Sequence, residues 1–163
     1  MPGGITAGTG ATLLVIGTDH RTSPAAWRDR FALMEVELAA ELDRLRGKGF
    51  AEAVLLATCD RIEVLTVGTD PVSVRLRVAE HLSERLGEHV ATVEAALYVH
   101  EGMSALRHLF AVASALDSLV VGEPHILGQL RAAHRAASEA GLASAGLESA
   151  KMGLEKPAAQ AVK

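Results

Sequence analysis

The chain has one cysteine, few aromatic residues and no long apolar run. A single cysteine excludes an internal disulfide, and the seven histidines lack the tight spacing that zinc sites require. No apolar stretch approaches the roughly 20 residues that a membrane-spanning helix needs. Met1 to Gly10 contain neither a basic residue nor an apolar core, so they resemble no secretory signal or transit peptide. We therefore expect a cytoplasmic protein without a metal site.

Positive charge is also scarce. Lys and Arg total 16 against 20 Asp and Glu, which gives a formal net charge of −4 at pH 7. Proteins that bind nucleic acid through its phosphates normally gather Lys and Arg on one face. The charge balance thus argues against DNA as a partner and requires that any RNA contact be local or assisted. The composition, 49% apolar and 22% charged, is typical of a soluble globular protein and not of a membrane protein.

The length of 163 residues is that of a single domain. We expect a flexible leader over residues 1–11, one domain over residues 12–141, and a weakly helical or disordered tail over residues 142–163. The glycines of the leader do not predict a dinucleotide site, because they precede the first apolar run, whereas a glycine fingerprint follows a strand and opens a helix.

Apolar runs alternate with helical patterns along the chain. Continuous runs at Leu13–Ile16, Ala53–Ala57 and Ile62–Val67 predict buried strands, and Ala95–Val99 predicts a short edge strand. The predicted fold is α/β (α+β), with a small mixed or antiparallel sheet of about four strands flanked by helices.

The helical patterns have clear start and stop signals. Ser23 as N-cap and Pro24 at the first helical position predict one long helix that ends at Gly47. Its apolar stripe comprises Trp27, Phe31, Met34, Leu38, Leu42 and Leu45. Further helices are predicted from the turn at Pro71 to Gly87, over Met103–Leu116, and from about Leu127 to Gly141.

Cys59 stands where an apolar run breaks into charge, in Ala57-Thr58-Cys59-Asp60-Arg61-Ile62-Glu63. This places it between two predicted strands. The thiolate is the reactive form of cysteine, and a neighbouring arginine favours it. Cys59 is therefore a candidate nucleophile. The alternative is a small buried hydrophobe, which is what a lone cysteine usually is.

His108 lies on a small-residue face of the helix predicted at Met103–Leu116. Its neighbours on that face are Ser104, Ala111 and Ala115, which would allow another segment to approach the imidazole closely. His108 could thus act in a cleft. A half-exposed helix histidine without a chemical role explains the spacing equally well.

Three segments carry a resemblance to a known family. These are Thr58–Glu63, His108–Phe110 and Ala115–Gln129, preceded by the opening Gly17–Pro24. Together they resemble the N-terminal catalytic domain of glutamyl-tRNA reductase, over about Leu13 to Gly141. The resemblance implies an enzyme that uses NADPH to reduce the glutamate carboxyl on glutamyl-tRNA to glutamate-1-semialdehyde, at the start of tetrapyrrole and hence porphyrin and heme synthesis.

The resemblance also implies roles for individual residues. Cys59 would attack the ester carbonyl to form a thioester, and His108 would transfer a proton. Arg61 would bind the substrate carboxylate through two parallel hydrogen bonds. The implied substrate-binding residues are Thr58, Cys59, Asp60, Arg61, Ser118, Glu123, Pro124, His125 and Gln129, and the implied partner is the acceptor end of glutamyl-tRNA.

The chain departs from the family pattern at three positions. Asp60 stands where the family usually has Asn, His125 replaces Gln, and Ala115 replaces Gly. A carboxylate at position 60 would disfavour the neighbouring thiolate and repel an acidic substrate.

The family's NADPH-binding and dimerisation domains do not fit into Gly141–Lys163, so no cofactor site is expected in this chain. Three functions remain open. The chain could be a reductase catalytic domain that works with an NADPH-binding partner chain. It could be a non-reducing truncated paralogue or remnant that binds glutamate, glutamyl-tRNA or the full-length enzyme. It could also be a thioester or ester hydrolase.

Overall fold

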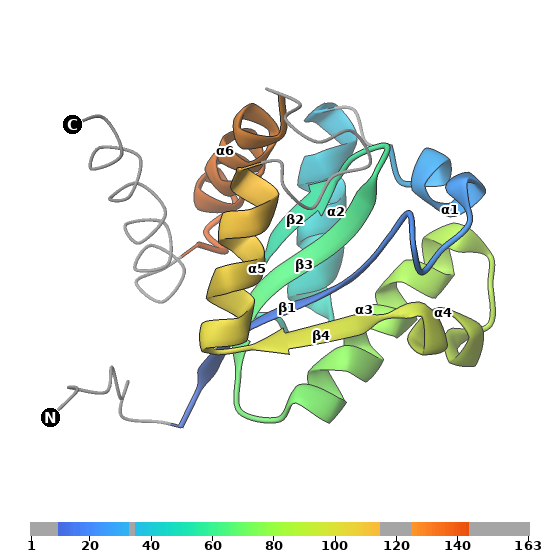
Figure 1. Ribbon diagram of the computed structural model, residues 1–163, viewed down its shortest axis with the longest axis horizontal. Helices are drawn as coiled ribbons and strands as arrows, with labels where there is room; N and C mark the ends of the chain where they lie inside the picture. Colours follow the sequence, from blue (N-terminus) through green and yellow to red (C-terminus); the bar gives the residue numbers. More distant parts are fainter. Residues whose placement is uncertain (1–9, 33–34, 115–124, 144–163) are drawn as a thin grey trace, which may run out of the picture.

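The computed structural model describes residues 10–32, 35–114 and 125–143. Within these ranges the chain forms one antiparallel sheet whose strands follow the order β2-β3-β1-β4 (Figure 1). The strands are β1 (Thr12–Asp19), β2 (Val54–Ala57), β3 (Arg61–Gly68) and β4 (Tyr98–Glu101). The predicted fold class is confirmed, and the sheet is antiparallel throughout the described residues.

Helices cover both faces of this sheet (Figure 1). On one face α3 contacts β1, β3 and β4, and it also packs on α1 and α4. On the other face α5 lies on β1 and β4, beside α6, which contacts β2. The helices are α1 (Ala25–Arg30), α2 (Glu35–Gly47), α3 (Pro71–Leu86), α4 (Val90–Ala96), α5 (Met103–Ala113) and α6 (His125–Glu139). Among the described helices, none is both long and apolar enough to cross a membrane.

The central strand β1 is buried on both faces, which explains its continuous apolar run. Leu14, Val15 and Ile16 are all fully buried between α3 on one side and α5 on the other. β1 pairs with β3 along its whole length and with β4 over Leu14–Gly17. This position makes β1 the element on which both sheet neighbours are aligned.

The long helix predicted between Pro24 and Gly47 is wrong as a single element. The structure has α1 and α2, and Pro24 is the N-cap of α1, while the Ser23 hydroxyl donates to the Asp19 carbonyl at 3.0 Å. The apolar stripe is nevertheless buried at Trp27, Phe31, Leu42 and Leu45, whereas Met34 lies outside the described residues. Helical periodicity reports which side chains face the core, and two successive helices can continue one stripe across a break.

The predicted edge strand is displaced. Ala95 and Ala96 end α4, and β4 begins at Tyr98. Val93 is buried from a helical position. Short apolar runs do not distinguish a buried helix from a strand, which is why the sequence placed the strand too early.

Gly17 lies where three strands meet in register. It faces Glu63 on β3 and Tyr98 on β4. A Cβ atom at position 17 would lie 2.2 Å from the Ile62 carbonyl oxygen and 2.8 Å from both Cα and Cγ of Glu63. The Glu63 side chain therefore occupies the space that any other residue at position 17 would fill.

We predict that Gly17→Ala destabilises the fold by about 3 kcal/mol, because two of the three clashing atoms belong to the backbone and cannot rotate away. Urea denaturation followed by circular dichroism measures the change. Gly47→Ala at the end of α2 is the matched control, because nothing lies within 4 Å of its Cβ position. Equal midpoints for the two variants would contradict the close packing over Gly17.

Candidate active site

Cys59 lies at the tip of a tight turn between β2 and β3. The Thr58 amide donates to the Arg61 carbonyl at 2.8 Å, which closes the turn. The Thr58 hydroxyl accepts from the amides of Asp60, at 3.1 Å, and Arg61, at 3.2 Å. Cys59 is exposed, so the alternative of a buried hydrophobe is wrong.

A buried arginine fixes this turn from the side of α1. The Arg28 Nε atom donates to the Cys59 carbonyl oxygen at 2.9 Å. Its Nη1 atom donates to the Ser23 carbonyl at 2.7 Å and to the Asp19 carbonyl at 3.4 Å. One guanidinium thus joins the end of β1, the start of α1 and the peptide of Cys59. No pattern in the sequence singled out Arg28, because a single arginine in a helix is usually exposed.

Directly after the turn, the chain buries a charge cluster. Arg61 and Glu63 are fully buried, and Asp60 is 8% exposed. The Arg61 Nη1 atom lies 3.2 Å from Glu63 Oε1, and Nη2 lies 3.1 Å from Asp60 Oδ2. The guanidinium therefore meets two carboxylates of its own hairpin. The contact with a substrate carboxylate that the resemblance implies would require one of these pairs to open.

Glu63 connects the cluster to β4 and α5. Its Oε1 atom also accepts hydrogen bonds from the Tyr98 hydroxyl and from His108 Nε2. The His108 ring stacks on His100, with 4.3 Å between ring centroids and 21° between planes. Glu63 thereby holds the ring of His108 with Nε2 directed at the carboxylate.

These contacts determine the charge on Glu63. Burial would raise the pKa of Glu63, but the hydrogen bond and charge of His108, the charge of Arg61 and the Tyr98 hydroxyl together hold it below the ordinary value of 4.5. Burial, and then the charge of Glu63, raise the pKa of Tyr98 far above its usual range. Glu63 is therefore ionised and Tyr98 is a neutral donor near pH 7.

On the opposite side of the turn, His20 faces Asp60. His20 directly follows β1, and its Nδ1 atom lies 2.6 Å from Asp60 Oδ1. The imidazole is partly exposed. The sequence pattern assigned no role to His20, Glu63 or Tyr98, although His20 and Glu63 lay within quoted motifs.

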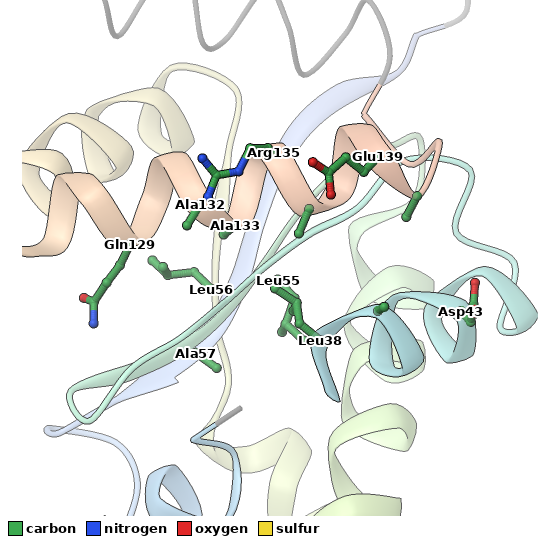
Figure 2. Close-up of a pocket in the computed structure, with 13 residues that line it drawn as sticks. Leu38, Asp43, Leu55, Leu56, Ala57, Gln129, Ala132, Ala133, Arg135 and Glu139 are labelled. Carbon is green, nitrogen blue, oxygen red and sulfur yellow. The ribbon is translucent and has the colours of Figure 1, made fainter. Parts of the chain in front are cut away.

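Gln129 is exposed on α6. It lines a pocket of about 580 Å³ between α2, β2 and α6 (Figure 2). Gln129 and Ala57 mark the end nearest the turn, and Asp43 and Glu139 lie towards the other end. Ser118, Glu123 and Pro124 lie outside the described residues, as do Ala115 and the side chain of His125.

The fold and the site define a small antiparallel α/β domain that presents one exposed thiol above a buried cluster of arginine, carboxylates and histidine. Residues 16–153 match the family model for the "Glutamyl-tRNAGlu reductase, N-terminal domain". The chain belongs to this family.

Named relatives agree with this assignment. The chain is 41% identical over 135 residues to a glutamyl-tRNA reductase of Rhodospirillum rubrum, covering 83% of this chain and 31% of the relative. The reductase of Solibacter usitatus is 44% identical over 130 residues, with 79% and 31% covered. The solved glutamyl-tRNA reductase from Methanopyrus kandleri superposes with a TM-score of 0.63 at 28% identity, over 85% of this chain and 31% of that one. The chain thus spans about a third of the length of these relatives.

We predict that Glu63→Gln costs about 3 kcal/mol at pH 7, because it removes one of the two carboxylates that pair with the buried Arg61 within the described residues. Because the pKa of Glu63 is lower in the folded protein than its ordinary value of 4.5, the Glu63 carboxylate stabilises the native state above pH 4.5. This contribution is lost as the pH falls through the folded-state pKa of Glu63. The variant should therefore lose less stability than the wild type on acidification below pH 4.5.

Urea midpoints between neutral and acid pH measure both effects. Glu84→Gln is the control, because Glu84 also has a lowered pKa, from its hydrogen bond to Lys48, but is exposed. Parallel pH profiles for wild type and Glu63→Gln would contradict the role of Glu63.

Proposed function

We propose that this chain carries the acyl-transfer step of a glutamyl-tRNA reductase. The Cys59 sulfur bonds to the carbonyl carbon of the glutamyl ester, the ester C–O bond breaks, and the tRNA leaves with a proton on its terminal hydroxyl. The observation that carries the proposal is the exposed position of the single thiol, at the tip of the turn, in a domain of this family.

The turn geometry supports attack on a bulky substrate. Cys59 projects from a hairpin whose peptide is held by Arg28 and whose amides bond to Thr58. An exposed and fixed nucleophile can reach an ester at the end of a large RNA without a rearrangement of the fold. The net charge of −4 fits contact at the acceptor end rather than along the tRNA backbone.

We assign His108 as the group that gives a proton to the terminal hydroxyl of the leaving tRNA. An imidazole can give or take a proton near neutral pH. Its ring is held by Glu63 and stacked on His100, so its orientation is fixed before substrate arrives. Glu63 acts here as a positioning residue.

Substrate binding is assigned to the remaining residues that match the family motif. The Thr58 hydroxyl holds the backbone of the turn, and the Asp60–Arg61 ion pair lies next to it in the same turn. Gln129 lines the pocket beside β2. We retain Ser118, Glu123, Pro124 and His125 as substrate-binding residues in this proposal.

The described residues do not fit NADPH. A dinucleotide fingerprint places glycines in a turn between a parallel strand and a helix. Gly17 instead lies inside an antiparallel strand, and the Glu63 side chain fills the space beside it. We therefore assign no hydride step to these residues. In the proposal for the whole protein, NADPH bound elsewhere, on a further domain or partner chain, would reduce the thioester to glutamate-1-semialdehyde for tetrapyrrole synthesis.

The direct test is to trap the thioester. We expect purified protein, incubated with glutamyl-tRNA and quenched in acid, to gain one glutamyl group by intact mass. Because a thioester is cleaved by neutral hydroxylamine and an amide is not, the adduct should disappear on hydroxylamine treatment. Cys59→Ala should form no adduct.

Deacylated tRNA with free glutamate is the matched negative control for that experiment. An adduct that persists in Cys59→Ala would place the reaction on another residue. If folded wild-type protein forms no adduct, the acyl-transfer proposal is contradicted. The remaining function is then that of a paralogue that binds substrate or the full-length enzyme.

We further predict that His108→Asn slows formation of the adduct by about 100-fold or more, the usual contribution of a general acid or base. Asn can still donate a hydrogen bond to Glu63, so folding should be preserved and can be checked by the thermal midpoint. His89→Asn, at an exposed position before α4, is the control. An unchanged rate of adduct formation in His108→Asn would exclude His108 from the proton transfer.

A further inference from the structure

We propose that Arg28 is a positioning residue for the reaction, which fixes the peptide between Cys59 and Asp60 and thereby sets the direction of the thiol. The inference rests on the proposed function in taking Cys59 as the nucleophile. It concerns an arginine of α1 that neither the motifs nor the family resemblance singled out. Arg28 acts through its hydrogen bonds alone, and no covalent bond to it is formed or broken.

The turn that carries Cys59 has no glycine at its centre. Ala57 pairs with Ile62, so the reversal between β2 and β3 has Cys59 and Asp60 as its two central residues. Two-residue hairpin loops favour glycine at these positions, because glycine adopts left-handed backbone conformations without a steric penalty. The shape of this turn therefore depends on the hydrogen bonds that surround it.

Both ends of the central peptide of the turn are held by side chains. The Asp60 amide donates to the Thr58 hydroxyl at 3.1 Å. The Cys59 carbonyl oxygen accepts from Arg28 Nε at 2.9 Å. The orientation of this central peptide is what distinguishes one common type of β-turn from another. Thr58 and Arg28 together therefore hold the turn in a single conformation, with Thr58 acting on the amide and Arg28 on the carbonyl.

Arg28 can hold this peptide because its own side chain is buried and fixed. Its Nη1 atom donates to the Ser23 carbonyl oxygen at 2.7 Å and to the Ser23 hydroxyl at 3.2 Å. A guanidinium is planar, so its donors keep a constant direction relative to one another. The bonds to Ser23 therefore fix the direction of the Nε donor that binds the Cys59 carbonyl.

The helix that carries Arg28 is itself anchored to the core. Phe31, which directly follows α1, is fully buried. Arg30 donates to the carbonyl of Leu86 at the end of α3, and Arg85 Nε donates to the Arg30 carbonyl at 3.1 Å. Through Arg28, the peptide of the turn is thus connected to the packed helices and not only to its own hairpin.

The direction of the thiol matters for attack on a bound ester. The reacting atoms must come within about 3–3.5 Å with their orbitals aligned, and a misplacement of about 1 Å can slow a reaction by about 100-fold. A small alkylating reagent has no such requirement, because it can approach an exposed thiol from many directions. Loss of Arg28 should therefore affect the two reactions of the Cys59 sulfur differently.

The motion of the turn can be measured without tRNA. Cys59 is the only cysteine, so a nitroxide attached through a disulfide labels this position alone. We expect the electron paramagnetic resonance spectrum to show greater label mobility in Arg28→Ala than in wild type. Arg75→Ala is the matched control, because the Arg75 side chain also donates to a backbone carbonyl, that of Glu94, but joins α3 to α4. It should keep the wild-type mobility.

The rates of the two reactions are then compared in the unlabelled proteins. We expect Arg28→Ala to lower the maximal rate of glutamyl-adduct formation by about 10- to 100-fold. The glutamyl-tRNA concentration that gives half of this rate should stay near its wild-type value, because Arg28 does not contact substrate in the proposal. The rate of alkylation by iodoacetamide should also stay near its wild-type value. Arg75→Ala should leave all three quantities unchanged.

A general structural role for Arg28 gives a different pattern. Adduct formation and alkylation would then slow together, and that result overturns the proposal, as does wild-type label mobility or a wild-type maximal rate in Arg28→Ala. Thermal midpoints identify a variant that fails to fold. In that case Arg28→Lys, which keeps the aliphatic stem and the charge but not the planar fork, replaces Arg28→Ala and should show the same separation of the two rates.

The two proposals fail separately. If wild-type protein forms no glutamyl adduct, the proposed function is contradicted, and the label mobility still decides whether Arg28 fixes the turn. If wild-type protein forms the adduct and Arg28→Ala forms it at the same maximal rate, the proposed function stands and the role of Arg28 is excluded.

Discussion

The buried guanidinium of Arg61 is the constraint on which the rest of the site depends. A charge removed from water must be paired within the protein, and Arg61 finds its partners on its own hairpin, at Asp60 and Glu63. Glu63 then requires further donors, which come from β4 and α5 as Tyr98 and His108. Space for the Glu63 side chain is available only because β1 has a glycine at the facing position. Three strands and one helix are thus aligned by one charged cluster.

The alternation of a strand, and its interruption at the turn, explain how the same hairpin carries both a buried cluster and an exposed thiol. Successive residues of a strand point to opposite faces, but the turn at Thr58 to Arg61 interrupts that alternation. Cys59 can therefore point to solvent while its neighbours face the interior. The backbone of Cys59 is nevertheless held in place, because Arg28 donates a hydrogen bond to its carbonyl oxygen.

Much of the fold could be predicted from local pattern. The β1, β2 and β3 strands and α3, with Asp70 before it and Gly87 in a left-handed conformation after it, carry their own start and stop signals. The division between α1 and α2 and the true start of β4 could not be predicted. The spacing of apolar residues shows which side chains are buried, but it does not show where a helix breaks or whether a short apolar run is helix or strand. The motif around Cys59 located the turn. His20 and Arg28 were missed because their partners, Asp60 and the Cys59 carbonyl, are distant in sequence and visible only once strand order is known.

The contacts of Glu63 also bear on the order in which the protein folds. Its hydrogen bonds span 35 residues to Tyr98 and 45 to His108. Contacts with such long separations must first overcome the entropy of closing a long loop, so they form after the local hairpin. The hairpin with Cys59 precedes α5 in the chain, and its strands are joined by a turn of only a few residues. The turn that carries the thiol can therefore form before Glu63 acquires its partner on α5, and the cluster is complete only when α5 has docked on β1.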